Sequence, residues 1–283
     1  MIANDRRARA VQLALVTCCF VALCGPAMAE EIKEEIKDEA SALAKKVQNP
    51  LANLVSLPFQ ANYNNGVGTD DRTFFNLNIQ PVIPFPGKKW DVISRTIIPL
   101  NSAPVPGSET ESEFGLGDTS LSLFWTPAKA SKLTWGVGPA ISIPTSSNPE
   151  ALGSGKWSLG PTGVIFYGTG NWTLGGVVSN IWSVAGDSDR EDVNFFVAQY
   201  FVNYNFGGGW ALGTAPIITC DWEAESGEQC TVPWGLQVSK VTHFGSRPVN
   251  LILGYYVNSE HPTGGAESQA RIQVNFMFPQ KKK

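Results

Sequence analysis

The sequence lacks a long apolar run. After residue 29, no segment reaches the about eighteen consecutive apolar residues that a membrane-spanning helix needs. A transmembrane helix is therefore excluded from this part of the chain. The mean hydropathy of -0.06 resembles that of a soluble protein, but a β-barrel gives the same average when a polar lumen face offsets an apolar lipid face.

Charged residues and histidines are also scarce. The formal net charge is -4, which argues against nucleic acid as a partner. The only two histidines are His243 and His261, and the topology predicted below puts them on opposite sides of a membrane. The sequence offers no catalytic set and no cofactor motif, so we predict a protein that is not an enzyme.

The first residues have the three parts of a secretory signal peptide. Three arginines among residues 1–9 supply positive charge, residues 11–23 are apolar, and Ala27-Met28-Ala29 is a small-x-small cleavage site. The apolar part is too short to span a bilayer. We therefore predict that residues 1–29 are a cleaved signal peptide; an uncleaved anchor and a lipoprotein modified at Cys24 are the alternatives.

Cleavage of that signal would leave two of the five cysteines, Cys220 and Cys230. They flank an acidic, glycine-containing loop where two antiparallel strands would emerge together, and export implies an oxidising route. We predict a Cys220–Cys230 disulfide, with two free thiols as the alternative. Because no histidine lies nearby, the pair does not suggest a metal site.

Residues 53–283 alternate between apolar and polar side chains in strand-length segments. The last segment, Arg271 to Phe278, has apolar residues at even positions and ends on an aromatic residue. A two-residue period gives a strand one apolar and one polar face. We count twelve such segments, near residues 54–64, 72–83, 89–98, 114–126, 133–143, 156–167, 171–183, 193–205, 210–219, 231–241, 249–258 and 268–278.

The connections between these segments alternate between short turns and longer polar loops. This alternation, an even number of strands and an apolar outward face are typical of outer-membrane barrels. We therefore predict an all-β fold for residues 53–283: a transmembrane antiparallel up-and-down β-barrel of about twelve strands. It would lie in the bacterial outer membrane, in contact with lipid and lipopolysaccharide.

Eight tryptophans fall near the predicted strand ends, where their amphipathic rings suit a membrane–water interface. They are Trp90, Trp125, Trp135, Trp157, Trp172, Trp182, Trp210 and Trp234. The alternative is a soluble β-sandwich with the tryptophans in its core. In that fold, Leu121, Leu123, Val274 and Phe276 would be hidden between two sheets.

Residues 30–52 differ from the barrel segments. They begin with a strongly charged stretch, apolar residues then recur near helical spacing, and Asn49-Pro50 would end a helix. We predict a short periplasmic amphipathic helix or a disordered arm. A plug inside the lumen is the alternative.

One long loop carries a cluster of carboxylates, Asp187, Asp189, Glu191 and Asp192. At this density, carboxylates can hold Ca²⁺ or Mg²⁺ between lipopolysaccharide head groups. A solvated acidic loop is the simpler interpretation, since the spacing is not that of an EF-hand. We therefore assign no metal site.

Five sequence strings resemble those of a known family: NPLANLVSLPFQ (49–60), LNIQPVIP (77–84), GLGDT (115–119), LGSGKWSLGP (152–161) and NIWSVAG (180–186). The chain resembles a family of bacterial outer-membrane transporters labelled as the meta-cleavage (MetA) pathway of phenol degradation, some of whose members carry the misleading name neuromedin U. The resemblance covers nearly all of the mature chain. It implies at most that some relatives pass aromatic molecules, and the family has no catalytic motif to transfer.

Polar residues at inward positions should line the lumen: Asn76, Asn78, Gln80, Arg95, Asp118, Gln199, Asn203, Gln237, Arg271, Gln273 and Asn275. Neutral amides outnumber charges in this set, and such a wall hydrogen-bonds water and neutral polar solutes without a strong ion field. Arg95, Arg271 and Asp118 would either form a constriction or pair with one another and brace a closed barrel.

These observations predict a passive channel or transporter for small organic molecules, including aromatic ones. The alternative is a non-conducting structural or adhesive barrel whose outer loops bind partners. The chemistry of the solute is not specified by the sequence, beyond the aromatic molecules that the resemblance implies.

Overall fold

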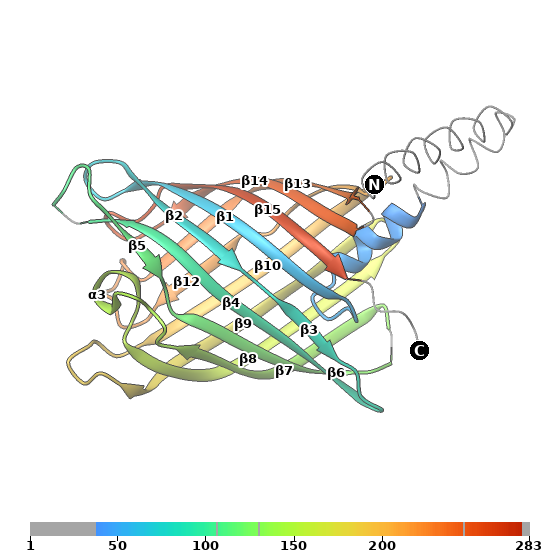
Figure 1. Cartoon of the computed structure of the whole chain (residues 1–283), viewed down its shortest axis with the longest axis horizontal. Coiled ribbons are helices and arrows are strands. Elements are labelled where there is room, and N and C mark those ends of the chain that lie inside the picture. Colours follow the sequence, from blue (N-terminus) through green and yellow to red (C-terminus); the bar gives the residue numbers. More distant parts are fainter. Residues whose placement is uncertain (1–37, 106, 130, 246, 279–283) are drawn as a thin grey trace, which may run out of the picture.

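The computed structural model describes residues 38–105, 107–129, 131–245 and 247–278. Residues 1–29, the predicted signal peptide, lie outside the described residues. The strands form one closed wall (Figure 1). They are β1 (Val55–Val67), β2 (Arg72–Ile79), β3 (Val82–Phe85), β4 (Trp90–Pro104), β5 (Ser112–Leu116), β6 (Thr119–Pro127), β7 (Leu133–Ile143), β8 (Lys156–Thr169), β9 (Trp172–Gly186), β10 (Asn194–Gly207), β11 (Trp210–Thr214), β12 (Ile217–Asp221), β13 (Cys230–Phe244), β14 (Arg247–Glu260) and β15 (Ser268–Phe278).

The wall is a closed antiparallel barrel. Each strand pairs with the strand at the next position along the wall, β9 pairs with β10, and β15 returns to pair with β1 along its whole length. Three of the twelve wall positions are occupied by two short strands in line, namely β2 with β3, β5 with β6, and β11 with β12. This confirms the predicted transmembrane barrel of twelve antiparallel strands.

Those three interruptions differ from the continuous strands predicted over 72–83, 114–126 and 210–219. Pro81 and Pro216 stand at two of the breaks, where a proline has no N–H to donate to the ladder. At the third break, Gly117 approaches the side chain of Asn101 too closely to tolerate a Cβ atom. At the break between β11 and β12, the backbone of Ala215 bonds to side chains in the interior.

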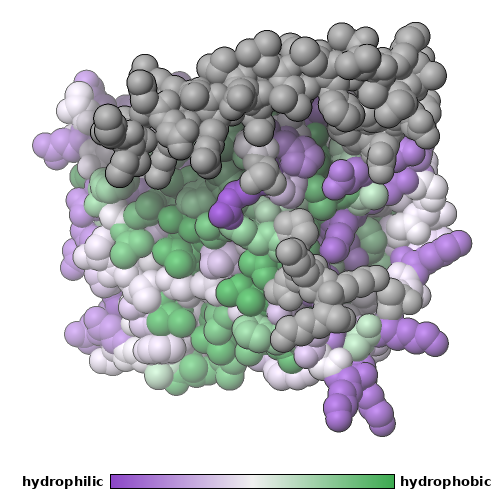
Figure 2. Space-filling view, turned by 45° about the vertical axis from the view of Figure 1, so that its right-hand side comes forward, coloured by the Kyte–Doolittle hydropathy of each residue, from purple (hydrophilic) through white to green (hydrophobic). Residues whose placement is uncertain are grey.

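The outer face of the wall is apolar. On β14, Leu253 on the outer face is 56% exposed, whereas Asn250 on the inner face is 4% exposed. Leu121, Leu123, Val274 and Phe276 are half-buried rather than enclosed between two layers, which excludes the β-sandwich. Figure 2 shows apolar side chains gathered over the middle of the visible face, with hydrophilic side chains towards its edges.

The two ends of the barrel differ. The short turns, the start of β1 and the end of β15 lie together at the right of Figure 1, and we name this the turn end. The longer connections, including helix α3 (Pro149–Leu152), lie at the opposite end, which we name the loop end. Within the described residues, no helix is both long and apolar enough to cross a bilayer.

The eight predicted tryptophans lie close to the two ends and are all between 41% and 61% exposed. Trp90, Trp172 and Trp210 are the first residues of their strands at the turn end, and Trp157 is the second residue of β8 at the loop end. Trp90 and Trp135 touch edge to face, with ring centroids 5.9 Å apart. Their positions fit the two interfacial rings of a membrane barrel.

The loop between β12 and β13 is closed by a disulfide. Cys220 and Cys230 are directly opposite each other across the two strands, with Cα atoms 4.1 Å apart. This confirms the predicted bond.

Candidate functional site

A polar cavity lies inside the barrel. It has a volume of about 190 Å³ and is lined both by strands and by the segment that precedes β1. Eight of the eleven predicted lumen residues line it: Gln80, Arg95, Gln199, Asn203, Gln237, Arg271, Gln273 and Asn275.

Strand alternation brings these polar side chains inside. On β15, Arg271 is 3% exposed and Asn275 is 6% exposed, whereas Ile272 is 47% exposed on the outer face. The same period puts Gln60 and Asn62 of β1 inside. These inward positions each add one polar group at a fixed height along the bore.

A chain of side-chain hydrogen bonds links the two lumen arginines. Arg95 donates to Gln80 Oε1 (2.9 Å), Gln80 donates to Gln60 Oε1 (3.4 Å), and Gln60 donates to Asn62 Oδ1 (3.2 Å). Arg271 Nε donates to the same Asn62 oxygen (3.2 Å). The chain crosses β4, the β2–β3 break, β1 and β15, so it runs around the wall rather than along one strand.

The chain continues beyond Arg271. The guanidinium also donates to Gln269 Oε1 (2.8 Å) and to the Ala215 carbonyl (2.9 Å), and it lies over the Tyr256 ring, 4.8 Å from the centroid. Tyr256 is fully buried and donates to Gln237 Oε1 (2.9 Å). We name the set Gln60, Asn62, Gln80, Arg95, Gln237, Tyr256 and Arg271 the polar belt.

The Ala215 carbonyl is available because β11 ends at Thr214 and β12 begins only at Ile217. Gln199 Nε2 also donates to this oxygen, at 3.3 Å. The break between β11 and β12 thus leaves the Ala215 carbonyl as an acceptor for interior side chains. In a continuous strand, this carbonyl would have bonded to the neighbouring strand.

The other three predicted lumen residues lie nearer the loop end. Asn76 accepts from Asn62 (3.1 Å) and donates to Asn101 (2.6 Å), and Asn78 is the register partner of Gln60 on β1. Asp118 accepts from the backbone N–H of Ser154 (2.7 Å) and from its hydroxyl (2.8 Å). Asp118 therefore anchors the β7–β8 loop and is not the partner of Arg95 or Arg271.

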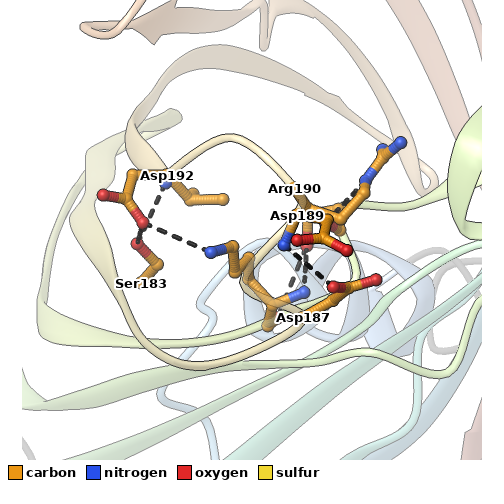
Figure 3. A network of polar contacts seen from close by, with 8 residues as sticks. Ser183, Asp187, Asp189, Arg190 and Asp192 are labelled. Atoms are coloured by element: carbon orange, nitrogen blue, oxygen red, sulfur yellow. Dashed lines mark hydrogen bonds and ion pairs between the residues drawn. The ribbon is translucent and has the colours of Figure 1, made fainter.

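The loop end is held by a second network, shown in Figure 3. Arg190 donates to the carbonyls of Pro149 (2.8 Å) and Gly153 (3.1 Å), which ties the β9–β10 loop to the β7–β8 loop. Asp192 accepts from Ser183 (3.1 Å) and forms an ion pair with Lys156 at 3.4 Å. The network fastens two neighbouring loops.

Two carboxylates of this loop, those of Asp187 and Asp192, are engaged in local contacts. Asp187 accepts from the backbone N–H of Asp189 at 3.0 Å (Figure 3). Among the described residues, no three His, Cys, Asp or Glu side chains lie close enough together to hold a metal ion. The loop has the contacts of a solvated, hydrogen-bonded loop.

Residues 38–54, which we name the N-terminal segment, lie across the turn end. Residues 38–47 are helical, and Ala44 packs with Val241 and Met277 on one side of the wall. Gln48 bonds to Asn205 of β10, with Gln48 Nε2 donating to Asn205 Oδ1 at 3.0 Å. Leu51 packs into the barrel on a third side.

The contacts of Leu51 form an apolar patch on the inner wall. The patch consists of Ile93 on β4, Phe124 on β6 and Val164 on β8, all at most 5% exposed, and Leu51 itself is 6% exposed. Because its contacts reach three sides of the wall, the N-terminal segment spans the bore.

The sequence interpretation missed several members of this interior. Gln60 and Asn62 follow the same alternation as the predicted residues and could have been found on β1. Tyr256 alternates in phase with Asn250 on β14 and could also have been placed inside, opposite Tyr255 on the outer face, which is 55% exposed. The positions of Gln48 and Leu51 depend on how the segment folds back, which strand periodicity does not encode.

The two histidines lie far apart. His243 stands one residue before the turn-end terminus of β13, and His261 follows the last residue of β14 at the loop end. The length of β14 separates them by roughly 40 Å. They cannot belong to one catalytic site.

Comparisons with known proteins agree with this architecture. The family model described as "Putative MetA-pathway of phenol degradation" matches residues 54–218, more than half of the chain. An outer membrane channel from Pseudomonas putida F1 is similar in fold, with a TM-score of 0.59 and 13% identity, and the match covers 80% of this chain and 94% of that one. The NanC porin gives a TM-score of 0.51 at 9% identity, covering 79% of this chain and all (100%) of that one. No curated protein matches the chain.

Proposed function

The chain belongs to the family described as "Putative MetA-pathway of phenol degradation", and we propose that it is a passive channel for small organic molecules in the bacterial outer membrane. This membership confirms the resemblance drawn from the sequence strings. The family description concerns phenol degradation, and it supports aromatic molecules as one class of solute.

The observation that carries the proposal is the contrast between the two faces of the wall. Apolar side chains cover the outside, whereas residues of the polar belt line one side of a cavity inside. Polar groups that line a bore replace part of the hydration of a solute and so lower the barrier to its passage. A barrel with no transport role needs no such cavity.

The proposal includes the surroundings of the chain. Residues 1–29 act as an export signal, residues 30–52 form a segment at the periplasmic end of the barrel that reaches into the bore, and residues 53–283 form the barrel. The exposed apolar side chains face lipid, and the loop end meets lipopolysaccharide. The protein is not an enzyme in this proposal, a view supported by the separation of His243 from His261.

A second function, a non-conducting structural or adhesive barrel, is favoured by one observation. The N-terminal segment contacts three sides of the wall and leaves only a small cavity behind it. Single-channel recording in planar bilayers separates the two functions. Discrete current steps from the purified protein are expected for a channel, and a folded barrel that gives no steps favours the structural role.

A further inference from the structure

The barrel interior holds two cationic side chains without an anionic partner. Within the described residues, the only ion pair is Lys156–Asp192 at the loop end. Asp118, which the sequence suggested as a partner of the two arginines, is bonded to Ser154 instead. Arg95 and Arg271 line the same cavity and are linked through Gln80, Gln60 and Asn62. The lumen therefore has a positive potential at the polar belt.

The two arginines differ in how much they are already engaged. Arg271 is 3% exposed and is fixed by three hydrogen bonds and the Tyr256 ring. Arg95 is only half-buried and, within the described residues, donates to Gln80 alone. Most N–H donors of the Arg95 guanidinium are thus free to bind a ligand.

Apolar side chains line the same cavity. Phe124, Val177 and Phe201 border it together with Arg95. Arg95 is two residues from Ile93, which is the register partner of Phe124 across β4 and β6. One molecule bound in this cavity could therefore contact a cation and an apolar surface at the same time.

Building on the proposed channel function, we propose that this cavity is a binding site for small organic carboxylates with an apolar body, such as an aromatic ring. Arg95 binds the carboxylate, and Phe124, Val177 and Phe201 contact the apolar body. A planar guanidinium matches a carboxylate with two parallel N–H···O bonds, which no neutral hydroxyl can reproduce. Arg271 also lines the cavity, but its donors are already bonded to protein groups. It therefore adds positive charge without touching the ligand.

The experiment uses benzoate as the probe, with benzamide as a neutral analogue of the same shape and acetate as an anion without a ring. Binding to the purified full-length mature protein is measured by isothermal titration calorimetry at neutral pH, where benzoate is ionised. Interruptions of single-channel current by each compound are recorded in parallel. Calorimetry does not depend on conduction, so the binding site and the channel function are tested separately.

Benzoate is expected to bind more tightly than benzamide and acetate. Arg95→Gln should weaken benzoate binding about tenfold or more, since a charged hydrogen-bond pair is lost, and should leave benzamide binding nearly unchanged. Arg247→Gln is the matched control, because Arg247 is exposed at the turn end beside Phe278 and lies outside the cavity. It should leave all three affinities unchanged.

Equal affinity for benzoate and benzamide, or an unchanged benzoate affinity in Arg95→Gln, would overturn the carboxylate site even if the protein conducts. Binding of benzoate that depends on Arg95 in a protein that gives no current steps would retain the site and reject the channel.

Discussion

Replacing Leu51 by alanine should open the turn end of the barrel. Leu51 is 6% exposed and packs on Ile93, Phe124 and Val164 in the inner wall. Truncating a buried leucine costs about 2–5 kcal/mol, and about 3 kcal/mol is reasonable here because the site borders a cavity and relaxes in part. A change of that size shifts the equilibrium between the seated and displaced N-terminal segment by roughly a hundredfold.

Single-channel recording measures this shift. If the displaced state occupies about 1% of the time in the original protein, it should occupy about half of the time in Leu51→Ala, seen as a second and larger conductance level. Leu253→Ala is the matched control, because it removes the same atoms from the lipid-facing side, where Leu253 is 56% exposed. It should leave the conductance levels as they are.

A covalent lock tests the same idea in the opposite direction. The side chains of Gln48 and Asn205 meet tip to tip at 3.0 Å, which is too far between backbones for a direct disulfide. Gln48→Cys with Asn205→Cys, joined by a short bis-methanethiosulfonate cross-linker, should hold the segment across the bore and suppress the larger level until a reductant is added. The original protein with reductant controls for the Cys220–Cys230 bond. Identical conductance in the original protein, Leu51→Ala and the locked variant would refute the view that the segment closes the bore.

Three further predictions concern the loop end. Asp118→Asn should release the β7–β8 loop, since the carboxylate that accepts two hydrogen bonds from Ser154 is lost, and limited proteolysis should then cut this loop faster than in the original protein. Cys220→Ser should lower the unfolding temperature seen as a band shift on gels, because a bridge over a sequence separation of 10 contributes about 2–3 kcal/mol; an unchanged temperature contradicts this. The pKa of Glu228 lies below its ordinary value of 4.5 because the backbone N–H and hydroxyl of Thr263 donate to the carboxylate. The ionised carboxylate therefore holds this contact above pH 4.5, and the contact weakens as the pH falls through the lowered pKa. The protection factor of the Thr263 amide, which is its hydrogen exchange corrected for the intrinsic effect of pH, should accordingly fall in acid, and a Glu228→Gln variant should show no such pH dependence.

The fold could be predicted because a strand that faces lipid on one side and the lumen on the other must alternate between apolar and polar residues. Alternation over 249–258 puts Leu251 and Leu253 outside and Asn250 inside, as the structure has them. The strand ends were harder, since β4 runs to Pro104 rather than to about residue 98. Beyond the membrane the wall faces water on both sides, so the strand continues without an apolar alternation to mark it.

The interior was only partly predictable, for a different reason. Alternation shows that Arg271 points inward, but the height of each strand in the barrel decides which groups it meets. Its partner at the Ala215 carbonyl exists only because Pro216 interrupts the wall. Likewise alternation predicted Asp118 as a lumen residue, yet it bonds to Ser154 of the β7–β8 loop. Such contacts depend on three-dimensional closure and not on a local pattern.

The energetic cost of the two lumen arginines argues against a merely filled barrel. Removing a guanidinium from water costs several kcal/mol even after the protein relaxes around it, and a neighbouring positive charge adds to that cost. Amides and a carbonyl compensate Arg271, but Arg95 has one amide oxygen only. A structural interior would be more stable with an aspartate opposite Arg95 or with apolar residues in its place. An anion that enters from solution supplies the missing partner, so the arrangement is least costly when the cavity is occupied. We therefore expect that an ionised carboxylate raises the unfolding temperature of the original protein, and that Arg95→Gln raises the unfolding temperature of the empty barrel while abolishing this response.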